Sequence, residues 1–208
     1  MQEKLKLSKL QGASMPSEKQ RMQNIPYASA VGSIMYAVRC TSPDVAFAQN
    51  MTCRFQQNPG EEHRTAVKNI LKYLRNTKDM FQVYGGNMER ELRVSCYTDA
   101  EYLTDADNLK SQIGYVFVLN GGVVDRKSTK QSFFTTSSTD AEYIAAFDES
   151  NEAVWIRKFI SGLGIVPTIE GPISMYCDNT GAITIAKDDG VTKCARHFRA
   201  KVHYLRDH

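Results

Sequence analysis

Three acidic residues occupy positions typical of a metal-binding carboxylate site. Asp99 ends the strand-like run RVSCYTD, Asp178 ends the strand-like run ISMYCD, and Glu142 lies in the first turn of a long helix-like segment. Sites in α/β sheets gather beyond the carboxyl ends of parallel strands, so parallel neighbours would bring Asp99 and Asp178 together. Three converging carboxylates repel one another unless divalent ions such as Mg²⁺ or Mn²⁺ bind them. The pattern therefore indicates a candidate two-metal carboxylate site.

Each of these acids also has a purely structural explanation. The stretch Thr139-Asp140-Ala141-Glu142 fits the S/T-x-x-E capping box, in which the glutamate satisfies backbone donors. A lone aspartate at a strand end, such as Asp99, commonly forms a turn. The following loop contains Asp105 and Asp107, but Leu109 occupies the next ligand position of a calcium loop, so we interpret both as solvated. The residue pattern alone leaves these alternatives open.

The elements that must position the acids follow an α/β order. Alternating runs predict strands, Asn120-Gly121-Gly122 predicts a hairpin turn, and apolar periodicity predicts helices. The expected elements are a strand at 91–100, a hairpin at 111–128, a further strand segment at 130–136, a helix at 139–160, a strand at 171–178, a short helix at 179–189 and a basic helix at 195–208. This order indicates an α/β sheet with an antiparallel part and a parallel crossover.

The N-terminal part has a different pattern. Residues 1–25 are polar, which predicts a mobile segment. The pattern of residues 26–86 predicts a helical region that ends in a short strand, 80–86, and Gly85-Gly86 is the expected domain boundary. Ser42 and Pro43 suit the start of its second helix. Its third helix has an apolar stripe, formed by Val67, Ile70, Leu71 and Leu74. We expect no active site here, and the third region, 91–208, to hold the acids.

Composition limits the function classes. The 208 residues are 42% hydrophobic and 24% charged, as in an ordinary globular protein, and no run suggests a membrane span or a signal peptide. Five cysteines without a CxxC pair favour reduced thiols in an intracellular protein. Residues 1–90 contain 13 Lys and Arg against 7 Asp and Glu, whereas 91–208 contain 13 against 16. This asymmetry fits either a polyanion-binding part beside a metal-binding part, or merely uneven solvated surfaces.

An ordered set of motifs resembles one known family. The motifs are YTDA, KSQIGYVFVLNGG, RKSTKQ, SSTDAEYIAA, EAVWIRKFI and MYCDNTGAI, preceded by IPYASAVGSIMYAVRCTSPDVAFA and AVKNILKYLRNTKDM. From roughly residue 25 onward the chain resembles the Pol polyprotein of copia-type LTR retrotransposons, above all plant elements. The match runs from the end of the reverse transcriptase region into the RNase H domain.

The resemblance implies an RNase H-like mixed sheet, with strands 1–3 antiparallel and strand 4 parallel to strand 1, and Asp99, Glu142 and Asp178 as metal ligands. Two Mg²⁺ ions, about 3.5–4 Å apart, would activate water to cut the RNA strand of an RNA–DNA hybrid during reverse transcription. The implied partners are this hybrid and the rest of Pol, including its reverse transcriptase. The implied location is intracellular, in cytoplasmic virus-like particles or in the nucleus.

Further expectations concern the substrate surface and the end of the chain. Lys110, Arg126, Lys127 and Lys130 are candidate phosphate contacts. Arg126 stands where the family usually has Trp. The family's fifth strand and last helix, with the AD-x-x-TK motif and a fourth metal ligand, have no counterpart here, so we expect a C-terminally truncated domain. Two functions remain open: a hybrid-cleaving nuclease, or a catalytically silent Pol remnant that at most binds nucleic acid.

Overall fold

The chain folds into two compact units. The computed structural model describes residues 6–81, 83, 93–164 and 171–187. The first unit contains the described residues up to Phe81 together with Asp105–Leu109, and the second contains the others. The predicted basic helix at 195–208 and most of the predicted strand at 80–86 lie outside the described residues.

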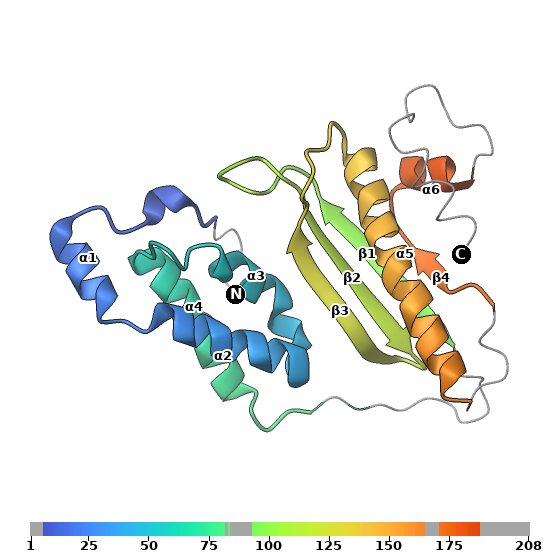
Figure 1. Ribbon diagram of the computed structural model, residues 1–208, viewed down its shortest axis with the longest axis horizontal. Helices are drawn as coiled ribbons and strands as arrows, with labels where there is room; N and C mark the ends of the chain where they lie inside the picture. Colours follow the sequence, from blue (N-terminus) through green and yellow to red (C-terminus); the bar gives the residue numbers. More distant parts are fainter. Residues whose placement is uncertain (1–5, 82, 84–92, 165–170, 188–208) are drawn as a thin grey trace. The chain divides into compact units, whose positions relative to one another are not determined.

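The first unit is helical (Figure 1). Its elements are η1 Lys9–Gln11, α1 Pro16–Gln23, α2 Tyr27–Cys40, η2 Pro43–Val45, α3 Ala46–Cys53 and α4 Glu61–Asn76. Val67 and Ile70 of α4 are buried against α2, and Leu74 packs at the edge of that cluster. Leu71 is 42% exposed, so the apolar stripe of α4 is narrower than its periodicity predicts.

The segment before α2 is folded where the structure describes it, which corrects the prediction of a mobile lead-in. Pro16 lies at the first position of α1, where its fixed φ suits a helix start. Leu7, Ala13 and Met22 are buried, which ties the segment to the first unit. The sequence did not reveal this because the buried positions are few and irregularly spaced.

The interpretation of Asp105 as solvated is also wrong. Asp105 is 5% exposed, and its Oδ2 accepts a hydrogen bond from Arg54 Nη1 at 2.6 Å. Its Oδ1 accepts bonds from the N–H groups of Asp107 and Asn108, which is an Asx-type turn. A buried carboxylate needs such partners, and here the cation comes from a residue 51 positions away.

The second unit is built on a four-stranded mixed sheet. The strands are β1 Val94–Glu101, β2 Gln112–Leu119, β3 Gly122–Lys130 and β4 Ser174–Tyr176, in the order β3-β2-β1-β4. β1 pairs antiparallel with β2 and parallel with β4. Two helices follow strands: α5 Ser138–Gly162 and α6 Thr180–Lys187. The predicted antiparallel part and parallel crossover are confirmed.

The hairpin between β2 and β3 turns at the predicted place, although Gly122 belongs to β3 and not to the turn. Leu119 pairs with Gly122, so Asn120 and Gly121 form a two-residue turn, and both have positive φ, 49° and 85°. This is the geometry of a type I′ turn, which favours Asn-Gly. Beyond Lys130 no strand continues, so the predicted strand segment at 130–136 is wrong. Gln131 instead donates its side-chain N–H to Ala141 O at 2.8 Å, which holds this loop to α5.

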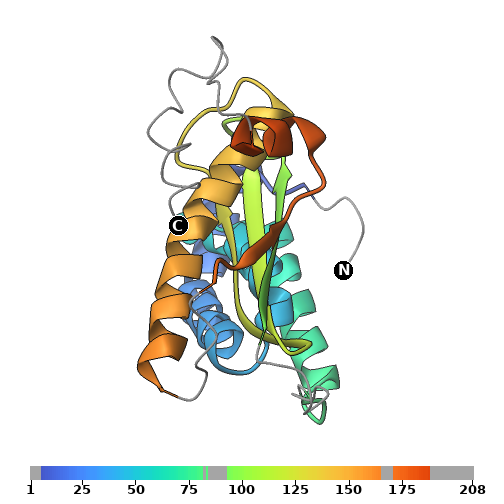
Figure 2. The same ribbon diagram turned by 90° about the vertical axis from the view of Figure 1, so that its right-hand side faces the viewer.

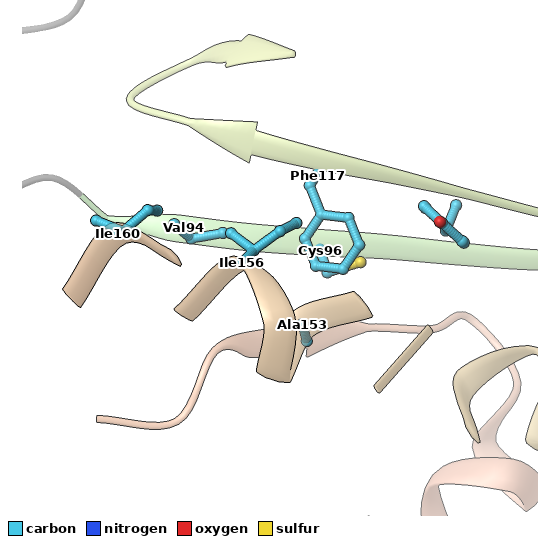
Figure 3. Close-up of a cluster of buried hydrophobic side chains, with 7 residues drawn as sticks. Val94, Cys96, Phe117, Ala153, Ile156 and Ile160 are labelled. Atoms are coloured by element: carbon cyan, nitrogen blue, oxygen red, sulfur yellow. The ribbon is translucent and has the colours of Figure 1, made fainter. Parts of the chain in front are cut away.

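Helix α5 covers one face of the sheet (Figures 1 and 2). Figure 3 shows the contact, in which Ala153, Ile156 and Ile160 of α5 pack on side chains of β1 and β2, including Cys96 and Phe117. Burial alternates along β1, with Cys96, Thr98 and Ala100 buried and the residues between them more exposed. The strand therefore presents one face to α5 and the other away from it.

Candidate metal centre

Asp99 and Asp178 follow the same register on two parallel strands. Tyr97 pairs with Tyr176, and their rings stack with centroids 5.0 Å apart. Asp99 lies two residues further along β1, and Asp178 lies two residues after Tyr176, just past the end of β4. Both aspartates are exposed. The structure thus places them at the carboxyl ends of neighbouring parallel strands, where α/β sheets usually form their sites.

Glu142 reaches the same region from α5. The helix is capped by Ser137, whose hydroxyl accepts from the Asp140 N–H at 3.1 Å. Glu142 therefore lies beyond the capping positions, and the capping-box alternative is wrong. Its Oε1 accepts a hydrogen bond from the Ala100 N–H at 3.1 Å. Ala100 directly follows Asp99, so this bond links the buried glutamate to the strand that presents the aspartate.

The tightest cluster contains a residue that sequence analysis missed. Potential ligand atoms of Glu142, Cys177 and Asp178 all lie within 4.8 Å of one another. The Cys177 thiol donates to Glu142 Oε2 at 3.6 Å. Asp99 is not part of this group, although it lies close enough to act on Glu142 electrostatically. Cys177 could have been suggested by its place next to Asp178, but a lone cysteine in an apolar strand usually indicates core packing.

The electrostatics of this cluster favour a cation. Burial raises the pKa of Glu142, and the negative charges of Asp99 and Asp178 raise it further. The Ala100 N–H and the Cys177 thiol act in the opposite direction by stabilising the ionised form. Burial also raises the pKa of Cys177, so its protonated thiol serves as a donor. Carboxylate oxygens suit hard ions, so the three acids fit Mg²⁺ or Mn²⁺.

Helix α6 begins two residues after Asp178 and lies beside the first turns of α5 (Figure 2). Asn179 Oδ1 accepts from the Ala182 N–H at 2.9 Å and caps the helix, and Thr139 Oγ1 donates to the same oxygen at 3.4 Å. At Gly181 an added Cβ would lie 2.9 Å from Thr139 Oγ1. The start of α6 thus packs closely on the start of α5, and this contact brings Asp178 to Glu142.

The four predicted phosphate contacts do not share one face. Asp99 pairs with Gly114, which in turn pairs with Ser128, so alternation puts Arg126 and Lys130 on the Asp99 face of β3 and Lys127 on the other. Nε and Nη2 of Arg126 are buried. Lys110 precedes β2, and its ammonium group donates to Ser132 O. A phosphate-binding role for these residues stays a prediction.

The strand order, the parallel β1–β4 pair and the long helix α5 define an RNase H-like fold. No family model matches the chain. It is 39% identical over 203 residues to the retrovirus-related Pol polyprotein from transposon TNT 1-94 of Nicotiana tabacum, covering 98% of this chain and 15% of that protein. It is 33% identical over 183 residues to the Pol polyprotein from transposon RE1 of Arabidopsis thaliana, covering 87% of this chain and 12% of that protein.

The chain belongs to the copia-type, retrovirus-related Pol polyproteins of retrotransposons, and it spans about 15% or less of the length of these two relatives. It is also 40% identical over 137 residues to the secreted RxLR effector protein 161 of Plasmopara viticola, covering 65% of this chain and 94% of that protein. Within the described ranges, no helix has the length and apolar character needed to cross a membrane.

Proposed function

We propose that the chain is a metal-dependent ribonuclease that cleaves the RNA strand of an RNA–DNA hybrid. The observation that carries this proposal is the convergence of Glu142 and Asp178, which lie within one cluster, beside Asp99 at the carboxyl ends of β1 and β4. Membership of the Pol family supports a function in retrotransposon replication. The remainder of Pol, including its reverse transcriptase, is the proposed partner.

Asp99, Glu142 and Asp178 would hold Mg²⁺, with Mn²⁺ as a substitute. When bound, the metal ions supply Lewis-acid activation of water and charge stabilisation at the leaving oxygen. Buried Glu142 is oriented by the Ala100 N–H and the Cys177 thiol, so its carboxylate is held in one place before substrate arrives. The two aspartates are exposed, which leaves the site open to a phosphodiester of a large substrate.

The strand faces suggest how a hybrid would be held. Arg126 and Lys130 lie on the Asp99 face of the sheet, where cationic groups can neutralise backbone phosphates. Selection of RNA over DNA would rest on 2′-hydroxyl contacts and on the shape of the hybrid, without reading of bases.

Cleavage of a labelled RNA–DNA hybrid by the purified chain, with and without Mg²⁺, tests the proposal. We expect Mg²⁺-dependent cuts within the RNA strand and none in a DNA duplex of the same sequence. Circular dichroism would verify that the chain is folded in each assay. A folded chain that binds the hybrid but never cuts it, in Mg²⁺ or Mn²⁺, would overturn the proposal in favour of a silent nucleic-acid-binding remnant.

A further inference from the structure

A second glutamate of α5 lies fully enclosed behind the candidate metal centre. Glu149 is 0% exposed and follows Glu142 by seven residues, two helical turns, so both point from the same side of α5 toward β1. The Cys96 thiol, itself 0% exposed, donates to Glu149 Oε1 at 2.8 Å. The Thr98 hydroxyl lies beside the same carboxyl group and helps to stabilise its ionised form.

The groups that surround Glu149 include no cation among the residues that influence it in the structure. The residues that influence Glu149 are Cys96 and Thr98 on β1, Glu142 on α5 and Tyr115 on β2. Asp125 on β3 and Glu152 on α5 act on the neighbours Cys96 or Tyr115. A fully buried carboxyl without a positive partner favours its neutral form. Burial accordingly raises the pKa of Glu149 to about 7, against the opposing effects of the Cys96 hydrogen bond and the nearby Thr98 hydroxyl.

Glu149 and Glu142 together attach β1 to α5 at two points. Glu142 accepts from the Ala100 backbone and Glu149 from the Cys96 side chain, four residues earlier on the strand. Asp99 lies between these two points. A change at the Cys96 end therefore shifts or tilts the segment that presents Asp99, even though Glu149 has no direct contact with the acids of the cluster.

We infer that Glu149 is a positioning residue for the metal centre, which anchors β1 on α5 through Cys96 and so fixes the separation of Asp99 from Glu142 and Asp178. This inference rests on the proposed function. Residues that orient metal ligands from behind typically change metal affinity by 10- to 100-fold when they are removed.

Mg²⁺ binding to the whole chain, measured by calorimetry without substrate at pH 6.0 and 8.5, tests the inference. Glu149→Ala removes the anchor and should weaken Mg²⁺ binding about tenfold or more at pH 6.0. Glu149→Gln keeps the size and an acceptor for the Cys96 thiol, so it should retain most of the Mg²⁺ affinity at both pH values. Asp148→Asn, an exposed neighbour on α5, is the matched control and should change neither value.

Cys96→Ser and Cys96→Ala give a second route that leaves the carboxyl in place. Ser keeps a donor to Glu149 and should retain most of the Mg²⁺ affinity, whereas Ala should resemble Glu149→Ala. Unchanged Mg²⁺ affinity in folded Glu149→Ala, at both pH values, would overturn the inference while leaving the proposed function intact. A wild-type chain that binds no Mg²⁺ and cleaves no hybrid would instead overturn the proposed function, and the positioning role with it.

Discussion

The two buried glutamates of α5 have the same residue type, similar burial and the same strand as partner, yet their surroundings differ. Glu142 is 5% exposed and lies beside Asp99, Asp178 and the Cys177 thiol, at an end of the sheet that opens to solvent. Glu149 is 0% exposed and is enclosed by Cys96, Thr98 and apolar side chains. Glu142 therefore lies among other acidic groups, whereas the surroundings of Glu149 are mostly apolar.

This difference shows that the cost of burying a glutamate can be offset in two ways on one face of α5. Burial raises the pKa of both glutamates, so the ionised form is costly at both positions. At Glu142 the nearby aspartates make a divalent cation the natural compensation, and two exposed ligands give it access. At Glu149 no ligand set surrounds the carboxyl group in the described structure, so protonation is the compensation that remains.

The largest expected effect comes from removing the charge of Glu142, the glutamate of α5 that lies beside the two aspartates. Glu142→Gln keeps the side-chain shape but removes the charge that would hold Mg²⁺. We expect cleavage of the hybrid to fall at least about a hundredfold, the scale expected when a catalytic group is misplaced. Thermal unfolding should stay the same or shift upward, because a buried charge is lost. Rates and melting curves at pH 7.5 measure both.

Asp148→Asn on the same helix is the control for that experiment, since its side chain is exposed. It should cleave like the wild type. If Glu142→Gln retained full Mg²⁺-dependent cleavage, Glu142 would be only a structural link to Ala100, and the contrast between the two glutamates would disappear.

The second prediction concerns Glu149 and is a change in the stability of the chain with pH. The pKa of Glu149 rises from its usual 4.5 to about 7 in the folded chain, so the folded state binds this proton more tightly than the unfolded state. The associated stability is fully present below pH 4.5 and is lost as pH rises to about 7. At about 1.4 kcal/mol per pKa unit, the loss is about 3 kcal/mol.

Glu149→Gln should remove this slope. Urea unfolding at pH 5 and at pH 8 measures it. Between these pH values the wild type should lose about 2.5 kcal/mol of its free energy of unfolding relative to the variant. Glu152→Gln, one turn away and only half-buried, should show little of this change. An equal pH dependence in wild type and Glu149→Gln would mean that Glu149 is already ionised at pH 5.

Sequence analysis predicted the candidate metal centre better than it predicted the buried position of Glu149. Asp99 and Asp178 stand out because each interrupts an apolar strand pattern at its end. Glu142 was ambiguous because five successive hydroxyl residues, at 135–139, precede Asp140, and only the observed cap at Ser137 places Glu142 beyond the capping turn. The tertiary bond to Ala100 decides its role, and no local pattern encodes that bond.

Glu149 could not be predicted as buried. A glutamate within a helix normally indicates a solvated face, and its partner Cys96 lies 53 residues away, where it reads as an ordinary apolar strand residue. The strands themselves were predictable, since alternation and the Asn120-Gly121 turn are local signals. The pairing of β1 with β4 followed only from the resemblance, because long-range parallel pairing leaves no local mark.

A smaller effect is expected where α6 packs on α5 near the open end. Gly181→Ala would place a Cβ 2.9 Å from Thr139 Oγ1, so the Thr139 side chain or one of the two helices must shift. We expect a loss of about 1–2 kcal/mol in stability, the usual cost of overpacking, and weaker Mg²⁺ binding through displacement of Asp178. The double variant Gly181→Ala with Thr139→Ala should recover much of the stability, and strict additivity of the two changes would contradict this explanation.

The smallest expected effect is the loss of the α6 cap. Asn179→Ala removes the oxygen that accepts from the Ala182 N–H and from Thr139 Oγ1, at a cost of about 1 kcal/mol. Asn179→Asp keeps the acceptor and should restore the stability, but it adds a negative charge beside Asp178, so we expect its Mg²⁺ affinity to differ from that of the wild type. Thr184→Ala, later in α6, removes only a hydroxyl bonded to Thr180 O and serves as the control.

If Asn179→Ala and Thr184→Ala had the same melting temperature and Mg²⁺ affinity as the wild type, the cap would contribute nothing to the placement of Asp178. The contact between α5 and α6 would then depend on the apolar packing of Ala182, Ile185 and Ala186 with Tyr143 and Ile144.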